Sequence, residues 1–137
     1  MTLYLDTSSL VKLYVTEPDS EAVAALTRDS DVVVTSALAY PEARATFARR
    51  RRERLMTPAE SKSAIAQLDA DWPRFVVVTL DEDLARAAGE LAQTHRLRGA
   101  DAVHLASFQA LLGWSDDEDV QFSAADAKLM RAARALG

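Results

Sequence analysis

Four short runs of β-branched and apolar residues, separated by longer segments of helical composition, constrain the fold of this chain most strongly. The runs are Leu3–Leu5, Val32–Thr35, Phe75–Thr79 and Val120–Ser123. Runs of this length and composition predict β-strands. Strands joined by helical crossovers pair in parallel and are covered by helices on both faces. We therefore expect an α/β fold of three layers, α/β/α, with a mostly parallel central sheet of about four strands.

The segments between the runs carry helix signals. Thr57-Pro58-Ala59-Glu60 combines an N-cap threonine, a proline in the first turn and the acid of a capping box. A helix is also expected from about Ser36 into the arginine-rich block, starting near Tyr40 or kinked there by Pro41. Further helices are expected over about Ala22–Leu26, Asp81–Thr94, Asp101–Leu112 with Gly113 as C-cap, and Ala127–Leu136 before Gly137.

Composition narrows the class of protein. The 137 residues suit one domain spanning positions 1–137, and the lack of cysteine excludes disulfides, thiolate metal sites and thiol nucleophiles. The net charge of −5 argues against a general nucleic-acid coat. The first residues do not form a signal peptide, and no apolar stretch is long enough to span a membrane. We expect a cytoplasmic protein without a membrane association.

Four acids lie where strands give way to helices: Asp6, Glu42, Asp101 and Asp126. The carboxyl ends of parallel strands share one rim of the sheet, so these acids can meet there. Clustered carboxylates need a cation, and oxygen ligands suit Mg²⁺ or Mn²⁺. The alternative is that Asp6, Asp101 and Asp126 only cap helices and that Glu42 lies on a solvated face. Spacing alone leaves both interpretations open.

Four segments resemble, in order, the motifs of PIN-domain proteins, and more narrowly those of the VapC toxins of toxin–antitoxin pairs. They are residues 4–14, 35–42, 97–106 and 120–133. The resemblance covers nearly the whole chain and implies a PIN-like fold and a metal-dependent endoribonuclease toxin. It also implies an RNA substrate, a cognate VapB-like antitoxin as inhibitor and a homodimer.

The resemblance assigns catalytic and metal-binding roles to the four acids. It implies that Asp6 and Asp101 bind Mg²⁺ or Mn²⁺ directly, and that Glu42 binds metal or orients the attacking water. Asp126 would serve a second ion or hold a metal-bound water. Family members often carry a hydroxyl residue two positions before this acid, where the present chain has Ala124. A metal-bound water or a nearby hydroxyl would then take its place.

Several further residues are candidates for the same site. Thr7 and Ser8 follow Asp6 and would either hydrogen-bond a metal-ligating carboxylate and hold it in place, or cap a helix. Arg49 lies two helical turns after Glu42, on the same face. Arg49, Arg52 and Arg98 are candidates for binding RNA phosphate or antitoxin carboxylates, and the alternative for the arginine block is a solvated helix end.

The remaining polar residues are given structural roles. His104 is expected to be a core histidine and His95 to interact with a helix C-terminus, so neither is assigned to catalysis. Lys12 and Glu17 are expected on a solvated face. The RNA target, the number of ions and the acid that orients water cannot be read from the sequence.

Two other functions compete with the ribonuclease. A catalytically silent PIN-like module would bind protein and have no affinity for metal. A receiver-like signalling domain would also gather acids around Mg²⁺, but it needs an acceptor aspartate after the middle strand, where this chain offers Asp81.

Overall fold

Strands and helices alternate along most of the chain, as the sequence predicts. The computed structural model describes residues 1–136. Its elements are β1 (Thr2–Leu5), α1 (Thr7–Val11), α2 (Ser20–Asp29), β2 (Val32–Ser36), α3 (Ala39–Arg52), α4 (Pro58–Asp71), η1 (Trp72–Arg74), β3 (Val76–Val78), α5 (Glu82–His95), α6 (Gly99–Trp114), β4 (Val120–Ser123) and α7 (Ala127–Leu136).

The four strands form one sheet in the order β3-β2-β1-β4, and every pairing is parallel. Leu3 pairs with Val33 on one side and with Gln121 on the other. The chain adds β2 and β3 on one side of β1 and later returns to place β4 on the other side. The carboxyl ends of β1 and β4 therefore flank a topological switch point, which is where open α/β sheets bind ligands.

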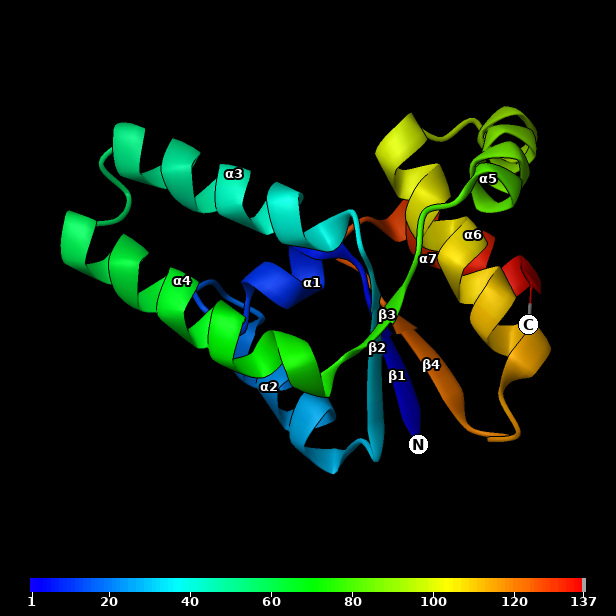
Figure 1. Cartoon of the computed structure of the whole chain (residues 1–137), viewed down its shortest axis with the longest axis horizontal. Coiled ribbons are helices and arrows are strands. Elements are labelled where there is room, and N and C mark those ends of the chain that lie inside the picture. The colour runs from blue at the N-terminus through cyan, green and yellow to red at the C-terminus, as the bar shows by residue number, and fades with distance from the viewer. Residues whose placement is uncertain (137) are drawn as a thin grey trace.

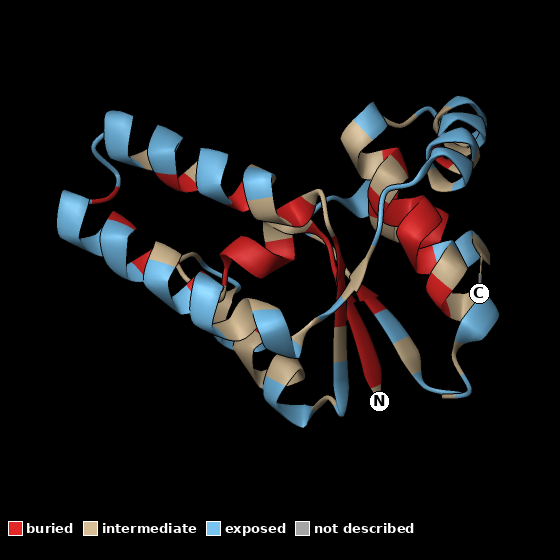
Figure 2. Cartoon of the chain, in the orientation of Figure 1, coloured by how far each residue is buried: buried red, intermediate tan, exposed pale blue. Residues whose placement is uncertain are grey.

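Helices cover both faces of the sheet (Figure 1). Side chains alternate along β1, so Leu3 and Leu5 pack into one apolar cluster with α1, α2, α3 and α4. Tyr4 points to the opposite face and joins Phe108 and Leu129 of α6 and α7. In Figure 2 the buried residues follow the sheet and the helix faces turned toward it. The predicted three-layer α/β/α arrangement is confirmed.

Helix α3 begins at Ala39, which places Pro41 in the first turn. The N–H groups of a first turn have no partner within the helix, so proline is tolerated there without a kink. The capping box at the start of α4 is confirmed. Thr57 Oγ1 accepts the N–H of Glu60 at 3.1 Å, and the Glu60 carboxylate accepts the N–H of Thr57 at 2.9 Å.

One predicted helix end is wrong. Gly113 is not a C-cap, because α6 continues through it to Trp114 and ends at Ser115, whose N–H donates to Leu111. No described glycine has a positive φ; the left-handed residues are Arg54 and Arg96, each just past a helix. The expectation for Gly137 lies outside the described residues. Within residues 1–136, no helix has the length and apolar character needed to cross a membrane.

Candidate active site

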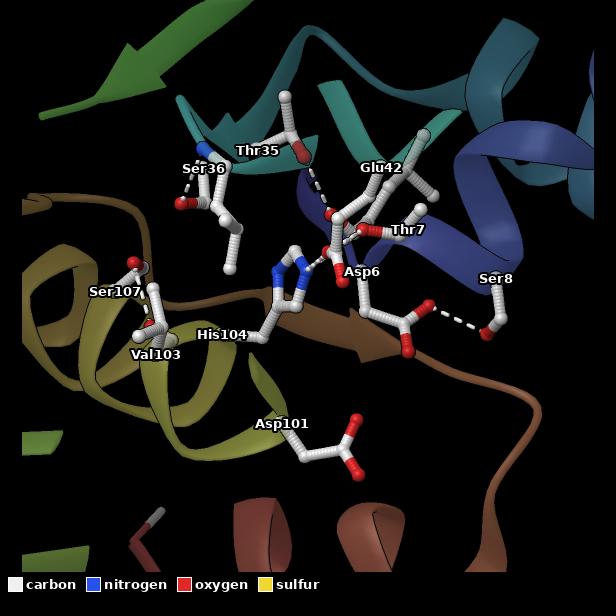
Figure 3. A network of polar contacts seen from close by, with 12 residues as sticks. Asp6, Thr7, Ser8, Thr35, Ser36, Glu42, Asp101, Val103, His104 and Ser107 are labelled. Carbon is white, nitrogen blue, oxygen red and sulfur yellow. Dashed lines mark hydrogen bonds and ion pairs between the residues drawn. The ribbon is translucent and has the colours of Figure 1, made fainter. Parts of the chain in front are cut away.

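Three of the four predicted acids line one cavity at the carboxyl ends of the strands. This cavity, with a volume of about 290 Å³, is bordered by Asp6, Glu42 and Asp101. The three come from the end of β1, the first turn of α3 and the first turn of α6. Figure 3 shows their side chains around the same space. We refer to this space as the acidic cavity.

Asp6 is held firmly and is almost fully buried, with 5% of its surface exposed. Its Oδ1 accepts the backbone N–H of Ser9 at 2.9 Å and the hydroxyl of Ser8 at 2.7 Å. Burial raises the pKa of Asp6 above its usual value, while Ser8, Ser9 and His104 oppose the rise and the charge of Asp101 adds to it. A cation beside this carboxylate would keep it ionised.

Glu42 is half-buried and receives hydrogen bonds on one oxygen. The hydroxyl of Thr7 donates to Oε1 of Glu42, and Nε2 of His104 lies 3.3 Å from the same oxygen. The contact with His104 is the main cause that holds the pKa of Glu42 below its usual value, and Thr7 contributes while burial opposes it. Glu42 is therefore an ionised acceptor at neutral pH.

Asp101 lies inside the first turn of α6, and Arg98 occupies the capping position, where it makes no side-chain cap. The cap-only interpretation is thus wrong for Asp101. Its Oδ2 lies 3.5 Å from the guanidinium of Arg98, which is 86% exposed. An exposed pair at this distance is weak, so the carboxylate can exchange partners readily.

Asp126 lies at the rim, outside the residues that line the acidic cavity. It is exposed, and its Oδ1 accepts the N–H of Leu129 at 2.9 Å, which caps α7 and is the main cause that lowers the pKa of Asp126. Its neighbour Ala125 does line the cavity and donates its N–H to Ser8 at 3.0 Å. The capping alternative therefore describes Asp126 well, although the preceding residue, Ala125, borders the cavity.

The cationic candidates separate into two groups. Arg49 and Arg98 line the acidic cavity, as does Lys12. Lys12 is only 8% exposed, so the expectation of a solvated face was wrong for it; its Nζ lies 3.7 Å from Asp19.

Arg52, the third arginine candidate, borders a different groove between α3 and α4. The helix geometry explains this difference. Arg52 lies ten residues after Glu42 on α3, so its side chain points about 80° around the helix axis from that of Glu42.

Sequence reasoning missed the contact of His104 with the site. This residue is buried, with 2% of its surface exposed, as expected of a core histidine. It also lines the acidic cavity and reaches Thr7 and Glu42. Its position three residues after Asp101 on one helix was the available signal, since such residues share a face.

The donor set of the acidic cavity suits a hard divalent cation, because it consists of carboxylate and hydroxyl oxygens. Burial disfavours the negative charge of Asp6, and a bound cation would compensate for that cost, which also suits a cation site here. As the side chains stand, no three histidines, aspartates or glutamates within residues 1–136 converge closely enough to hold an ion. The donors fit Mg²⁺ or Mn²⁺ in chemistry, and the coordination shell is not preformed.

A wider cavity of about 530 Å³ lies between β3, α5 and α6 and has different chemistry. It is bordered largely by apolar residues such as Val77, Leu84 and Trp114, together with Asp81. Asp81 accepts the N–H of Leu84 and caps α5. The acceptor required by the receiver-like interpretation is thus a helix cap that borders a different cavity from Asp6, Glu42 and Asp101.

The comparison with protein families matches residues 3–133 to the PIN domain. Two Mycobacterium tuberculosis proteins, Ribonuclease VapC45 and Ribonuclease VapC49, are each 42% identical over 113 residues, covering 80% of this chain and 76% of theirs. Ribonuclease VapC46 from the same species is 34% identical over 114 residues, covering 80% of this chain and 75% of its own.

Several solved structures share the fold, among them a chain of a toxin–antitoxin complex from Klebsiella pneumoniae, with a TM-score of 0.64 and 16% identity, covering 92% of this chain and 88% of that one. A chain of FitAcB from Neisseria gonorrhoeae aligns with a TM-score of 0.71 and 20% identity, covering 96% of this chain and 93% of that one. A chain of VapBC2 from Rickettsia felis, bound to a DNA fragment from their promoter, aligns with a TM-score of 0.58 and 13% identity, covering 90% and 100%. At these identities the likeness concerns the fold.

Proposed function

The chain belongs to the PIN-domain family, among the VapC ribonucleases, and from this premise we propose that it hydrolyses RNA in the acidic cavity. The observation that carries the proposal is the convergence of Asp6, Glu42 and Asp101 from three separate segments at the switch point of the sheet. Family membership also excludes the receiver-like interpretation of the chain.

We propose that Asp6, Glu42 and Asp101 together hold Mg²⁺ or Mn²⁺, with Asp126 assisting from the rim. A divalent ion bound there would lower the pKa of a water molecule and neutralise charge on the phosphate. Ser8 and the N–H of Ser9 keep Asp6 aimed. Glu42, whose pKa is lowered, stays ionised and can serve the ion as a carboxylate ligand.

The RNA backbone would approach the acids past Arg49 and Arg98, the exposed cations of the acidic cavity. Arginine pairs well with phosphate oxygens, so these two side chains would position the scissile phosphate. The cavity border contains His104 but no tyrosine, tryptophan or phenylalanine. Binding should therefore depend on the phosphates more than on base stacking. Attack by water on phosphorus is expected to leave a 5′-phosphate and a 3′-hydroxyl.

The partners follow from the same premise. One structural neighbour is a toxin–antitoxin complex, and the relatives are named VapC ribonucleases, so we propose that a VapB-like antitoxin inhibits this chain. We also propose that the active form is a homodimer in the cytoplasm. Arg98 supports the inhibitor proposal, because an exposed guanidinium at the cavity border is available to an antitoxin carboxylate. Co-purification with the product of an adjacent short gene tests this part of the proposal.

The enzymatic part is tested by cleavage of a mixed RNA substrate by the purified protein. Cleavage should require Mg²⁺ or Mn²⁺, should stop with EDTA and should be lost in Asp6→Asn. The variant Asp81→Asn is the matched control, since Asp81 caps α5 away from the acidic cavity and should leave cleavage unchanged. Full activity in EDTA would refute the metal mechanism. Absence of both metal affinity and cleavage would favour the silent PIN-like module.

A further inference from the structure

A chain of polar contacts leads from the sheet core to the carboxylate of Glu42. Tyr4 Oη lies 2.8 Å from Nδ1 of His104. On the other side of the imidazole, Nε2 lies 2.9 Å from Thr7 Oγ1 and 3.3 Å from Glu42 Oε1. Figure 3 shows His104 turned toward Thr7 and Glu42. We call Tyr4 and His104 the buried pair.

The buried pair lies against aromatic rings on the face of the sheet that α6 and α7 cover. Tyr4 is fully buried, and its ring stacks on Phe122 with the centroids 5.3 Å apart. Phe108 contacts both aromatic rings edge-on. A hydroxyl and an imidazole buried among apolar rings are unfavourable unless each is hydrogen-bonded. Apolar residues would fill the same space without that requirement, so the polar pair calls for a role.

The direction of the hydrogen bonds follows from the proton of Tyr4. A phenol hydroxyl is protonated at neutral pH, so the Tyr4 hydroxyl, 2.8 Å from Nδ1 of His104, donates to that nitrogen. A neutral imidazole that accepts at Nδ1 carries its proton on Nε2. The ring is thereby a donor toward Glu42 and Thr7. The Thr7 proton then goes to Glu42, which accepts it on Oε1.

Both contacts with Glu42 end on the same oxygen. Oε1 faces Thr7 and His104, whereas Oε2 has no hydrogen bond among the residues 1–136 that the structure describes. Glu42 borders the acidic cavity. A carboxylate fixed through one oxygen loses rotational freedom and presents the other oxygen in a defined direction. This arrangement is how outer partners orient the ligands of metal sites.

We propose that His104, set in its Nε2–H tautomer by Tyr4, is a positioning residue that fixes Oε1 of Glu42 together with Thr7 and leaves Oε2 for the divalent cation. This inference deepens the proposed function and rests on the metal role of Glu42. If the buried pair only satisfied its own hydrogen bonds, its loss would lower stability and leave metal binding unchanged. The two roles therefore differ in a measurable way.

The test measures Mn²⁺ affinity by calorimetry on the full chain without RNA. His104→Leu removes the donor and should weaken Mn²⁺ binding about 10- to 100-fold, the range typical for loss of such outer partners. Tyr4→Phe keeps the ring packing and should weaken binding less, because the imidazole remains but its tautomer is no longer set. His104→Gln, which restores an N–H donor, should recover most of the affinity. Leu111→Ala, in the same apolar cluster, should lower the melting temperature alone.

Nitrogen-15 NMR of the metal-free protein gives a second measurement that does not depend on the His104 variants folding. The wild type should show Nδ1 of His104 as an unprotonated acceptor and Nε2 as protonated, and Tyr4→Phe should give a mixture of tautomers. A protonated Nδ1 in the wild type would overturn the proposal. So would wild-type Mn²⁺ affinity in both Tyr4→Phe and His104→Leu.

Glu42→Gln separates this inference from the proposed function on which it rests. If Glu42→Gln lowers Mn²⁺ affinity and cleavage while the variants of the buried pair do not, only the positioning role of His104 fails. If Glu42→Gln itself leaves Mn²⁺ affinity and cleavage unchanged, the metal role of Glu42 fails and the inference fails with it.

Discussion

The hydroxyl of Ser8 donates to Oδ1 of Asp6 at 2.7 Å. The hydroxyl oxygen of Ser8 in turn accepts the N–H of Ala125 at 3.0 Å, so the Ser8 side chain joins the end of β1 to the segment after β4. The two strands flank the topological switch point, and Ser8 links the segments that follow them above the acidic cavity. Ser8 therefore hydrogen-bonds the carboxylate of Asp6, whereas Thr7 donates to the carboxylate of Glu42.

Ser8→Ala should weaken metal binding more than it weakens the fold. The substitution removes a donor from Asp6 and an acceptor from the exposed N–H of Ala125, which water can replace, so the expected cost is about 0.5–1.5 kcal/mol in unfolding free energy. Loss of an outer partner of a metal ligand lowers metal affinity by about 10- to 100-fold. Calorimetry with Mn²⁺ and urea unfolding would measure the two effects.

Ser30→Ala is the matched control for Ser8→Ala. Ser30 also donates one hydrogen bond, to the carbonyl of Leu26 at 2.6 Å, but it lies at the end of α2 away from the acidic cavity. It should lower stability without changing Mn²⁺ affinity. Equal Mn²⁺ affinities of wild type and Ser8→Ala would contradict the supporting role of Ser8.

Asp6→Asn should stabilise the metal-free protein at neutral pH. Burial raises the pKa of Asp6, so the native state binds this proton more tightly than the unfolded state does. The stability of the metal-free wild type therefore falls as pH rises from the unfolded pKa through the raised native pKa, and it stays reduced above that. Asparagine can still accept from Ser8 and Ser9 through Oδ1, and it carries no charge.

Thermal unfolding between pH 4 and pH 8 checks this expectation for Asp6. The melting temperature of metal-free Asp6→Asn should exceed that of the wild type at pH 7, and the difference should shrink toward pH 4. Mn²⁺ should raise the melting temperature of the wild type only. A variant less stable than the metal-free wild type at pH 7 would show that the buried charge is already compensated within the chain.

Arg49→Ala should weaken RNA binding more than Arg52→Ala does. The two substitutions remove the same charge from the same helix, but only Arg49 borders the acidic cavity. When one phosphate contact is lost, the slope of log K plotted against the logarithm of the salt concentration becomes shallower by about one unit. Binding of a non-cleaved RNA by the Asp6→Asn protein at several salt concentrations would measure it. Equal effects of both variants would indicate that RNA follows the whole arginine block.

Local patterns in the sequence predicted most of the fold. The run Val32–Thr35 and the capping box at Thr57 depend on neighbouring residues alone, and both are present in the structure. The convergence of Asp6, Glu42 and Asp101 could also be expected, because parallel strands share a rim. What failed depends on packing between distant segments.

His104 illustrates the limit of the sequence. Its partner Tyr4 lies 100 positions earlier in the chain, and no local pattern pairs the two. Lys12 is similar, because nothing in its local sequence indicates that only 8% of its surface is exposed. Gly113 failed for a different reason: glycine permits a helix to end but does not require it, and α6 continues through it to Trp114.

Arg54→Gly should stabilise the protein. Arg54 follows α3 with a φ of 60°, and the N–H of Leu55 donates to Arg50 at 2.8 Å, which is the geometry of a left-handed helix end. This conformation costs a non-glycine residue roughly 1–2 kcal/mol, and part of the gain is offset by the greater freedom of glycine when unfolded. A net gain of about 0.5–1 kcal/mol is expected in urea unfolding. Arg51→Gly, inside α3, should lose about 1 kcal/mol.

Asp126→Asn should impair metal binding less than Asp6→Asn does. Asp126 is exposed, caps α7 through Leu129 and does not border the acidic cavity, whereas Asp6 is buried inside it. Asparagine keeps the cap, so stability should change by less than about 0.5 kcal/mol. Mn²⁺ affinity should be lost in Asp6→Asn and reduced only moderately in Asp126→Asn. Equal losses would mean that the rim closes on the metal and brings Asp126 into direct contact with it.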